Sequence, residues 1–147
     1  MKRANILTTQ PDAYKAIMGL ENYVIGSEIE PIHKELIKLR SSQINGCAYC
    51  LDMHSRDARK LGETEQRIYT LSAWRDTPFF DDKEQAILAL TEEVTMISKG
   101  GVSDETYDKA TGLLGANYVG QVIMAIITIN AWNRIAISSH FQPTLQK

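Results

Sequence analysis

The chain has 147 residues, 44% hydrophobic and 23% charged, which is enough apolar material for one domain with its own core. Its formal net charge of −2 leaves no basic excess for phosphate contacts, so nucleic acid is not an expected partner. No apolar run is long enough to span a bilayer, and Met1–Thr9 lacks the apolar segment of a secretion signal. We therefore expect no membrane partner and a cytoplasmic protein.

Hydrophobic residues recur at helical spacing along the chain. Asp12 begins the first predicted helix, which ends at Gly26. Ser27–Glu30 has the pattern of a capping box for a second helix, with Pro31 in its first turn and an end near residues 42–46.

Asn45 is predicted to cap a third helix, Cys47 to about Leu61, which Gly62 ends. Further helices are predicted over residues 63–74, from the capping box Asp81–Glu84 to about Ser98, from Ser103 onward, and from about Tyr118 to Ser139. Sustained strand-like alternation is missing. The sequence predicts an all-α fold: a single compact domain spanning residues 1–147, with about six to seven helices and a core from about 12 to 139.

The last predicted helix is apolar on most of its faces, which a chain of this length cannot cover alone, so we expect a homo-oligomer. The candidate interface residues are Tyr118, Ile123, Ile126 and Ile127. Trp74 and Trp132 are expected in the core or at subunit contacts. Asn130 and Arg134, one turn apart, could line a functional site or an interface.

Two cysteines, Cys47 and Cys50, lie three residues apart, too close to cross-link a fold usefully. In a reducing compartment such a pair is typical of catalysis or metal binding. Cys47, Cys50 and His54 share one helix face, near a helix start that stabilises a thiolate. One thiol can serve as a nucleophile, and the other can then close a disulfide.

Two residues could move protons for these thiols. His54 lies one turn after Cys50 and could exchange protons with its sulfur. Glu35 shares a helix face with Leu36 and Leu39, where burial would raise the pKa of its carboxyl toward neutrality and suit it to proton transfer. A boundary glutamate that reaches water explains the same pattern equally well.

Two other interpretations of the cysteines remain open. They could be small buried core residues, or they could bind zinc together with His54 and a fourth ligand from His33, Glu35 or water. A second Cys/His pair is missing from the sequence, so we expect no metal and no cofactor.

The motif of Glu35, Cys47-Ala48-Tyr49-Cys50 and His54, with the spacing Glu-x11-Cys-x2-Cys-x3-His, resembles the alkylhydroperoxidase D-like (AhpD-like) proteins of the carboxymuconolactone decarboxylase superfamily. The resemblance extends from about Glu30 to Val94, and Asn130–Arg134 also resembles family members. It implies an all-α fold, assembly into trimers or hexamers, and reduction of a hydroperoxide substrate at the expense of a dithiol reductant.

By this resemblance Cys50 attacks the peroxide, Cys47 resolves it to a disulfide, and Glu35 and His54 relay protons. The helix dipole alone would favour Cys47 as the stronger thiolate. Tyr49 stands where some members have a histidine, and it could contact the substrate. The alternatives are a lactone decarboxylase, whose chemistry does not need the cysteine pair, and a thiol redox sensor or metal-binding oligomer.

Overall fold

A computed structural model describes residues 2–147, and over this range the protein is built from helices without strands. The elements are α1 (Ile6–Thr9), α2 (Pro11–Ile25), α3 (Pro31–Asn45), α4 (Ala48–Lys60), α5 (Glu65–Thr70), α6 (Asp82–Thr95), α7 (Asp104–Leu114) and α8 (Ala116–Ser138), with 3₁₀ segments at Leu71–Asp76 and Ile97–Lys99. The all-α prediction is confirmed. The predicted number of helices was too low, because the four-residue α1 is too short to show hydrophobic periodicity.

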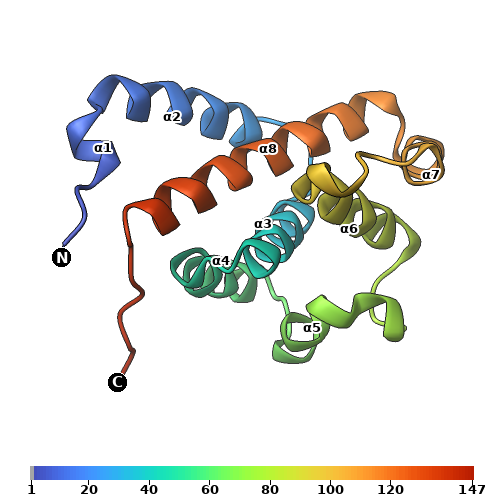
Figure 1. The fold of residues 1–147 in the computed structure, drawn as a ribbon. Helices are drawn as coiled ribbons and strands as arrows, with labels where there is room; N and C mark the ends of the chain where they lie inside the picture. The colour runs from blue at the N-terminus through green and yellow to red at the C-terminus, as the bar shows by residue number, and fades with distance from the viewer. Residues whose placement is uncertain (1) are drawn as a thin grey trace.

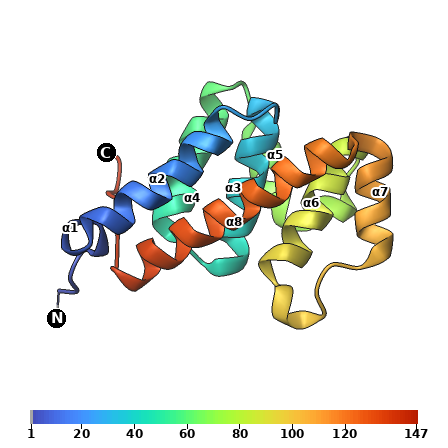
Figure 2. The same ribbon diagram turned by 90° about the horizontal axis from the view of Figure 1, so that it is seen from above.

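Helix α8 is the long central helix of the fold (Figure 1). It contacts α2, α3, α6 and α7, and α3 in turn contacts α4 and α6. Seen from above, α2 runs beside α8 in the opposite chain direction (Figure 2). This arrangement brings α4, which carries both cysteines, against α3 and close to the C-terminal end of α8.

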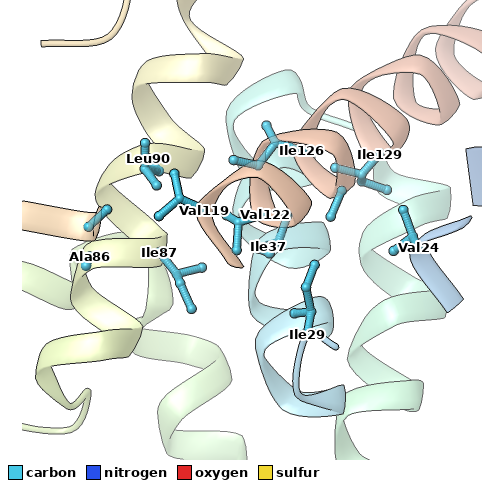
Figure 3. Packing of buried hydrophobic residues seen from close by; sticks show 12 residues of the cluster. Val24, Ile29, Ile37, Ala86, Ile87, Leu90, Val119, Val122, Ile126 and Ile129 are labelled. Atoms are coloured by element: carbon cyan, nitrogen blue, oxygen red, sulfur yellow. The ribbon is translucent and has the colours of Figure 1, made fainter. Parts of the chain in front are cut away.

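The main core forms where α8 meets α2, α3 and α6 (Figure 3). Its members include Val24, Ile29, Ile37, Ala86, Ile87, Leu90, Val119, Val122, Ile126 and Ile129. Ile126 is fully buried in this cluster, so its prediction as an oligomer-interface residue was wrong: it faces the core of its own chain. Ile127, the next residue of the helix, remains 42% exposed.

Both tryptophans pack within the chain and use their indole N–H groups. Trp74 is buried and donates to Oε1 of Glu92 over 2.8 Å, while the partly buried Trp132 donates to Oε2 of Glu21 over 2.9 Å. Each indole is therefore satisfied inside the chain, as a buried Trp requires.

Asn130 belongs to a network of polar side chains between α8, α3 and α6. Its amide nitrogen donates to Oγ1 of Thr95, and its oxygen accepts from Asn45 and Arg134. Asn130 therefore holds helices together, and it is absent from the lining of the cavity described below.

Two predicted helix caps were wrong. The hydroxyl of Ser27 donates to the carbonyl of Val24 and so closes α2, while α3 begins after Glu30 with no side-chain cap. Asn45 is the last residue of α3, and its amide donates to Asn133 as well as to Asn130. In contrast, the capping box at Asp81 and Glu84 is present at the start of α6.

Among residues 2–147, no single helix is long and apolar enough to cross a bilayer. Helices α7 and α8 meet that requirement only when joined, and they are bent by 120° where they meet.

Candidate active site

The turn between α3 and α4 sets the position of the cysteine pair. Gly46 has a φ of 70°, the left-handed conformation in which a helix commonly ends. The N–H groups of Gly46 and Cys47 donate to the carbonyls of Gln43 and Ser42, the two bonds of a Schellman motif. Cys47 is consequently the N-cap of α4, and its Sγ accepts the backbone N–H of Cys50 over 3.3 Å.

The two cysteine sulfurs form a disulfide, with a Cα–Cα distance of 5.3 Å. The structure therefore describes the oxidised form of the pair. Both residues are buried and pack with Ala136 of α8 and with Phe141 beyond it. Only Cys50 of the two lines the neighbouring cavity.

This cavity has a volume of about 360 Å³ and a mainly apolar wall. It is lined by Leu7, Tyr14, Glu21, Val24, Lys38, Tyr49, Cys50, Met53, His54, Asp57, Ala125, Thr128, Ile129, Trp132, Ala136 and Phe141. Leu7 and Phe141 come from the two chain ends, outside the core predicted over residues 12–139. The cavity therefore brings apolar side chains from α1, α2, α8 and the C-terminal segment to one sulfur of the disulfide.

Glu35 and His54, the two motif residues expected to move protons, lie together beside the cavity. Nδ1 of His54 lies 3.2 Å from Oε2 of Glu35, and both side chains are buried. Lys38, one turn after Glu35 on α3, donates to Oε1 of Glu35 over 3.3 Å. No hydrogen bond joins His54 to either sulfur in the described part of the chain.

The expected rise in the pKa of Glu35 is wrong. Burial, the strongest influence, does raise the pKa of this carboxyl, but His54 and Lys38 together lower it by more. The pKa therefore lies below its ordinary value, and Glu35 is a carboxylate at neutral pH. A charged Glu35 can accept a proton but is not a neutral reservoir of one.

Tyr49 lies on the cavity wall, between the two cysteines in sequence. It is 37% exposed, and its ring meets the edge of the Phe141 ring with centroids 5.6 Å apart. Its hydroxyl has no part in the contact between Glu35 and His54. Tyr49 thus lies on the partly exposed wall of the cavity, outside the contact between Glu35 and His54.

Three charged cavity residues were not predicted from the sequence, namely Glu21, Lys38 and Asp57. Two of them, Lys38 and Asp57, are related to the motif by helical spacing. Each lies three residues after a motif residue on the same helix, Lys38 after Glu35 and Asp57 after His54. Residues three apart are neighbours on a helix, so the distance of these two residues from the motif could have indicated that they lie near the site.

Similarity to known proteins identifies the family of this chain. The sequence model of the carboxymuconolactone decarboxylase family matches residues 11–93, more than half of the chain. The chain belongs to the carboxymuconolactone decarboxylase family. The uncharacterised protein YdfG of Bacillus subtilis is 42% identical over 137 residues, which cover 93% of each chain.

The AhpD-like character is also supported. An alkyl hydroperoxide reductase AhpD from Streptomyces griseus is 37% identical over 67 residues, 45% of this chain and 38% of that protein. A crystal structure from Agrobacterium tumefaciens, of a protein of unknown function linked to the antioxidant defence protein AhpD, superposes with a TM-score of 0.95. That protein is 38% identical and covers 99% of this chain and 100% of its own. The debrominase Bmp8, 21% identical with a TM-score of 0.81 over 95% of this chain and 76% of its own, shares the fold.

Proposed function

We propose that this protein is a thiol peroxidase that reduces organic hydroperoxides to alcohols and is itself reduced by an external dithiol. The observation that carries the proposal is the Cys47–Cys50 disulfide at the start of α4, with one sulfur on the wall of a mainly apolar cavity. The AhpD relatives, named alkyl hydroperoxide reductases, support the same activity.

The first step is assigned to Cys50, because it lines the cavity whereas Cys47 does not. The Cys50 thiolate attacks the outer oxygen of the hydroperoxide and the O–O bond breaks. The sulfur becomes a sulfenic acid, and the alkoxide takes a proton to leave as the alcohol.

The second step regenerates a disulfide. The Cys47 thiolate attacks the Cys50 sulfur, hydroxide leaves as water after taking a proton, and the S–S bond forms. As the N-cap of α4, Cys47 accepts the backbone N–H of Cys50, a contact that also favours its thiolate in the reduced form. An external dithiol then returns both cysteines to thiols by disulfide exchange.

His54 and Glu35 are assigned to proton transfer. His54 lies on the cavity wall, one turn after Cys50, and can take the thiol proton and pass one to the alkoxide. The Glu35 carboxylate, 3.2 Å from Nδ1, stabilises the imidazolium that forms in between. Tyr49 is proposed to contact the organic part of the substrate.

The activity is tested by following consumption of cumene hydroperoxide with dithiothreitol as reductant. Cys50→Ser is expected to abolish turnover. Cys47→Ser is expected to consume one equivalent and then stall, because its sulfenic acid cannot be resolved within the chain. In the wild-type protein, one equivalent of hydroperoxide is expected to remove two thiols per chain.

Two results would contradict this proposal. One is equal residual turnover in the two variants, which would remove the division of roles. The other is a reduced protein that keeps both thiols when treated with organic hydroperoxide. A lactone decarboxylase would tolerate both serine substitutions, since its chemistry does not need the pair.

A further inference from the structure

Three side chains converge beside the cavity, and one of them, Asp57, has no role in the proposed peroxidase chemistry. Nδ1 of His54 lies 3.2 Å from Oε2 of Glu35 and 3.9 Å from Oδ2 of Asp57. One potential ligand atom from each residue lies within 4.8 Å of the other two. One imidazole nitrogen and two carboxylate oxygens form a donor set that suits a divalent cation such as Zn²⁺.

Two of these atoms are buried and lack hydrogen-bond partners. Glu35 and His54 are only 7% and 8% exposed, and no well-oriented hydrogen bond reaches Oε2 of Glu35 or Nδ1 of His54, although the two atoms are neighbours. Buried polar atoms nearly always have a partner. The nearest partner of each atom is the other, 3.2 Å away, so a proton or a cation held between them would satisfy both.

Each of the two carboxylates has a lysine as an ion-pair partner, with the Glu35–Lys38 pair mostly buried and the Asp57–Lys60 pair at the surface. Nζ of Lys38 lies 3.3 Å from Oε1 of Glu35, and Nζ of Lys60 lies 3.5 Å from Oδ1 of Asp57. Each lysine contacts one oxygen of its carboxylate, Oε1 of Glu35 or Oδ1 of Asp57. The other oxygen of each carboxylate is the one that lies near His54. Outer partners of this kind orient the carboxylates of metal sites.

The two distances from His54 are compatible with a tetrahedral site. Zinc bonds of 2.0–2.2 Å place neighbouring ligand atoms about 3.4 Å apart, near the two distances from His54 given above. His54 and Asp57 both line the cavity, which gives a cation its route of entry and leaves room for a water as fourth ligand.

We propose that Glu35, His54 and Asp57 form a binding site for a divalent cation, with Zn²⁺ as its probe. The cation takes the place of the proton between Glu35 and His54. Zn²⁺ binding is measured without peroxide, so the test of this site is independent of the test of the peroxidase function. If both proposals hold, bound Zn²⁺ occupies the proton relay and inhibits turnover.

The test is a calorimetric titration of Zn²⁺ into fully oxidised protein, in which a thiol assay has shown no free cysteine. One Zn²⁺ per chain is expected, with weaker binding at lower pH because protons compete for the ligands. Asp57→Asn is expected to weaken binding at least tenfold. Asp57 is partly exposed, so this variant should fold, which circular dichroism checks.

Two controls separate this site from others. Asp52→Asn removes another α4 carboxylate, which pairs with Arg56 over 2.8 Å, and should leave Zn²⁺ binding unchanged. His33→Gln removes a histidine that lies 3.8 Å from Glu30 and should also leave it unchanged. Equal affinity in wild type and Asp57→Asn, loss of binding in His33→Gln, or no stoichiometric binding would each overturn the proposal.

Discussion

Lys38 lines the cavity and forms an ion pair with the buried carboxylate of Glu35. Its Nζ lies between two carboxylates, 3.3 Å from Oε1 of Glu35 and 3.9 Å from Oε1 of Glu21. With His54, it lowers the pKa of Glu35 against the effect of burial. The pKa of Glu35 therefore depends in part on a residue outside the cysteine motif.

Lys38→Met is expected to raise the pKa of Glu35 and to move the acid limb of the peroxide kcat/KM profile to higher pH. The sign follows because the relay needs charged Glu35, and a higher pKa means that protonation removes it sooner as the pH falls. Lys34→Met is the matched control, since Lys34 donates to the carbonyl of Ile25 instead. An acid limb that is unchanged in Lys38→Met would mean that the ionisation of Glu35 does not control kcat/KM.

Glu35→Gln tests the relay directly. The variant keeps His54 but removes the carboxylate that supports its proton transfer. General acid–base catalysis typically contributes about a hundredfold in rate, so turnover of cumene hydroperoxide is expected to fall by up to about that factor. Gln keeps the shape of the side chain, and the thermal midpoint should change little. A large drop in the midpoint with normal turnover would instead make Glu35 a structural residue.

At the scale of elements, the turn at Gly46 decides how α4 begins. Its φ of 70° is a conformation that costs other residues about 1 kcal/mol. Gly46→Ala is therefore expected to lower the free energy of unfolding by about 1 kcal/mol and to reduce turnover, because Cys47 follows directly. Urea unfolding measures the first effect and the peroxide assay the second.

Gly19→Ala provides the matched control for this substitution. Gly19 lies inside α2 on an exposed face with nothing within 4 Å of an added Cβ. Alanine there should stabilise the protein by about 0.5–1 kcal/mol. Equal effects at the two glycines would contradict the role assigned to the Gly46 turn.

The elements that sequence predicts well are those whose causes are local. The capping box at Asp81 and Glu84 needs only its own four residues, and it forms as predicted. Ser27 fails because its hydroxyl has two local choices, and it closes α2 rather than opening α3. Asn45 fails because α3 continues through it and turns at Gly46, so that Cys47 becomes the N-cap of α4.

The candidate site shows the same division. Glu35 and His54 meet because a short turn joins their helices, a cause that is local in the sequence. The lowered pKa of Glu35 could not be predicted, since it depends on the balance between burial and two nearby side chains. The apolar cavity wall needs Leu7 and Phe141 from opposite chain ends, a contact that no local pattern encodes.

For the whole molecule, a homo-oligomer of three or six chains stays a prediction. Helix α8 keeps Ile127 and Ile137 each 42% exposed, as large apolar side chains available for a subunit contact. Light scattering is expected to give a mass three or six times 16.5 kDa, and Ile127→Glu is expected to reduce it. Leu145→Glu, in the exposed C-terminal segment, should leave the measured mass unchanged. A wild-type mass of one chain would contradict the prediction.

Acid stability is the second property of the whole molecule, and Glu92 is central to it. Its carboxylate accepts from Trp74 over 2.8 Å, from Arg40 over 3.0 Å and from Arg75 over 2.6 Å, and so connects α6 to α3 and to the 3₁₀ segment Leu71–Asp76. Burial raises the pKa of this carboxyl, but the three donors lower it by more, so the folded pKa lies below the ordinary value.

A carboxyl whose pKa is lower in the folded than in the unfolded protein stabilises the fold at neutral pH, and this contribution is lost as the pH falls through and below the ordinary value of about 4.3. Glu92→Gln should therefore cost about 2 kcal/mol in urea unfolding at pH 7. It should also flatten the decline in stability toward pH 3, because the variant has no carboxylate there to protonate. Asp108→Asn, on an exposed position of α7, should change neither quantity. A Glu92→Gln curve parallel to that of the wild type would mean that protonation elsewhere controls acid unfolding.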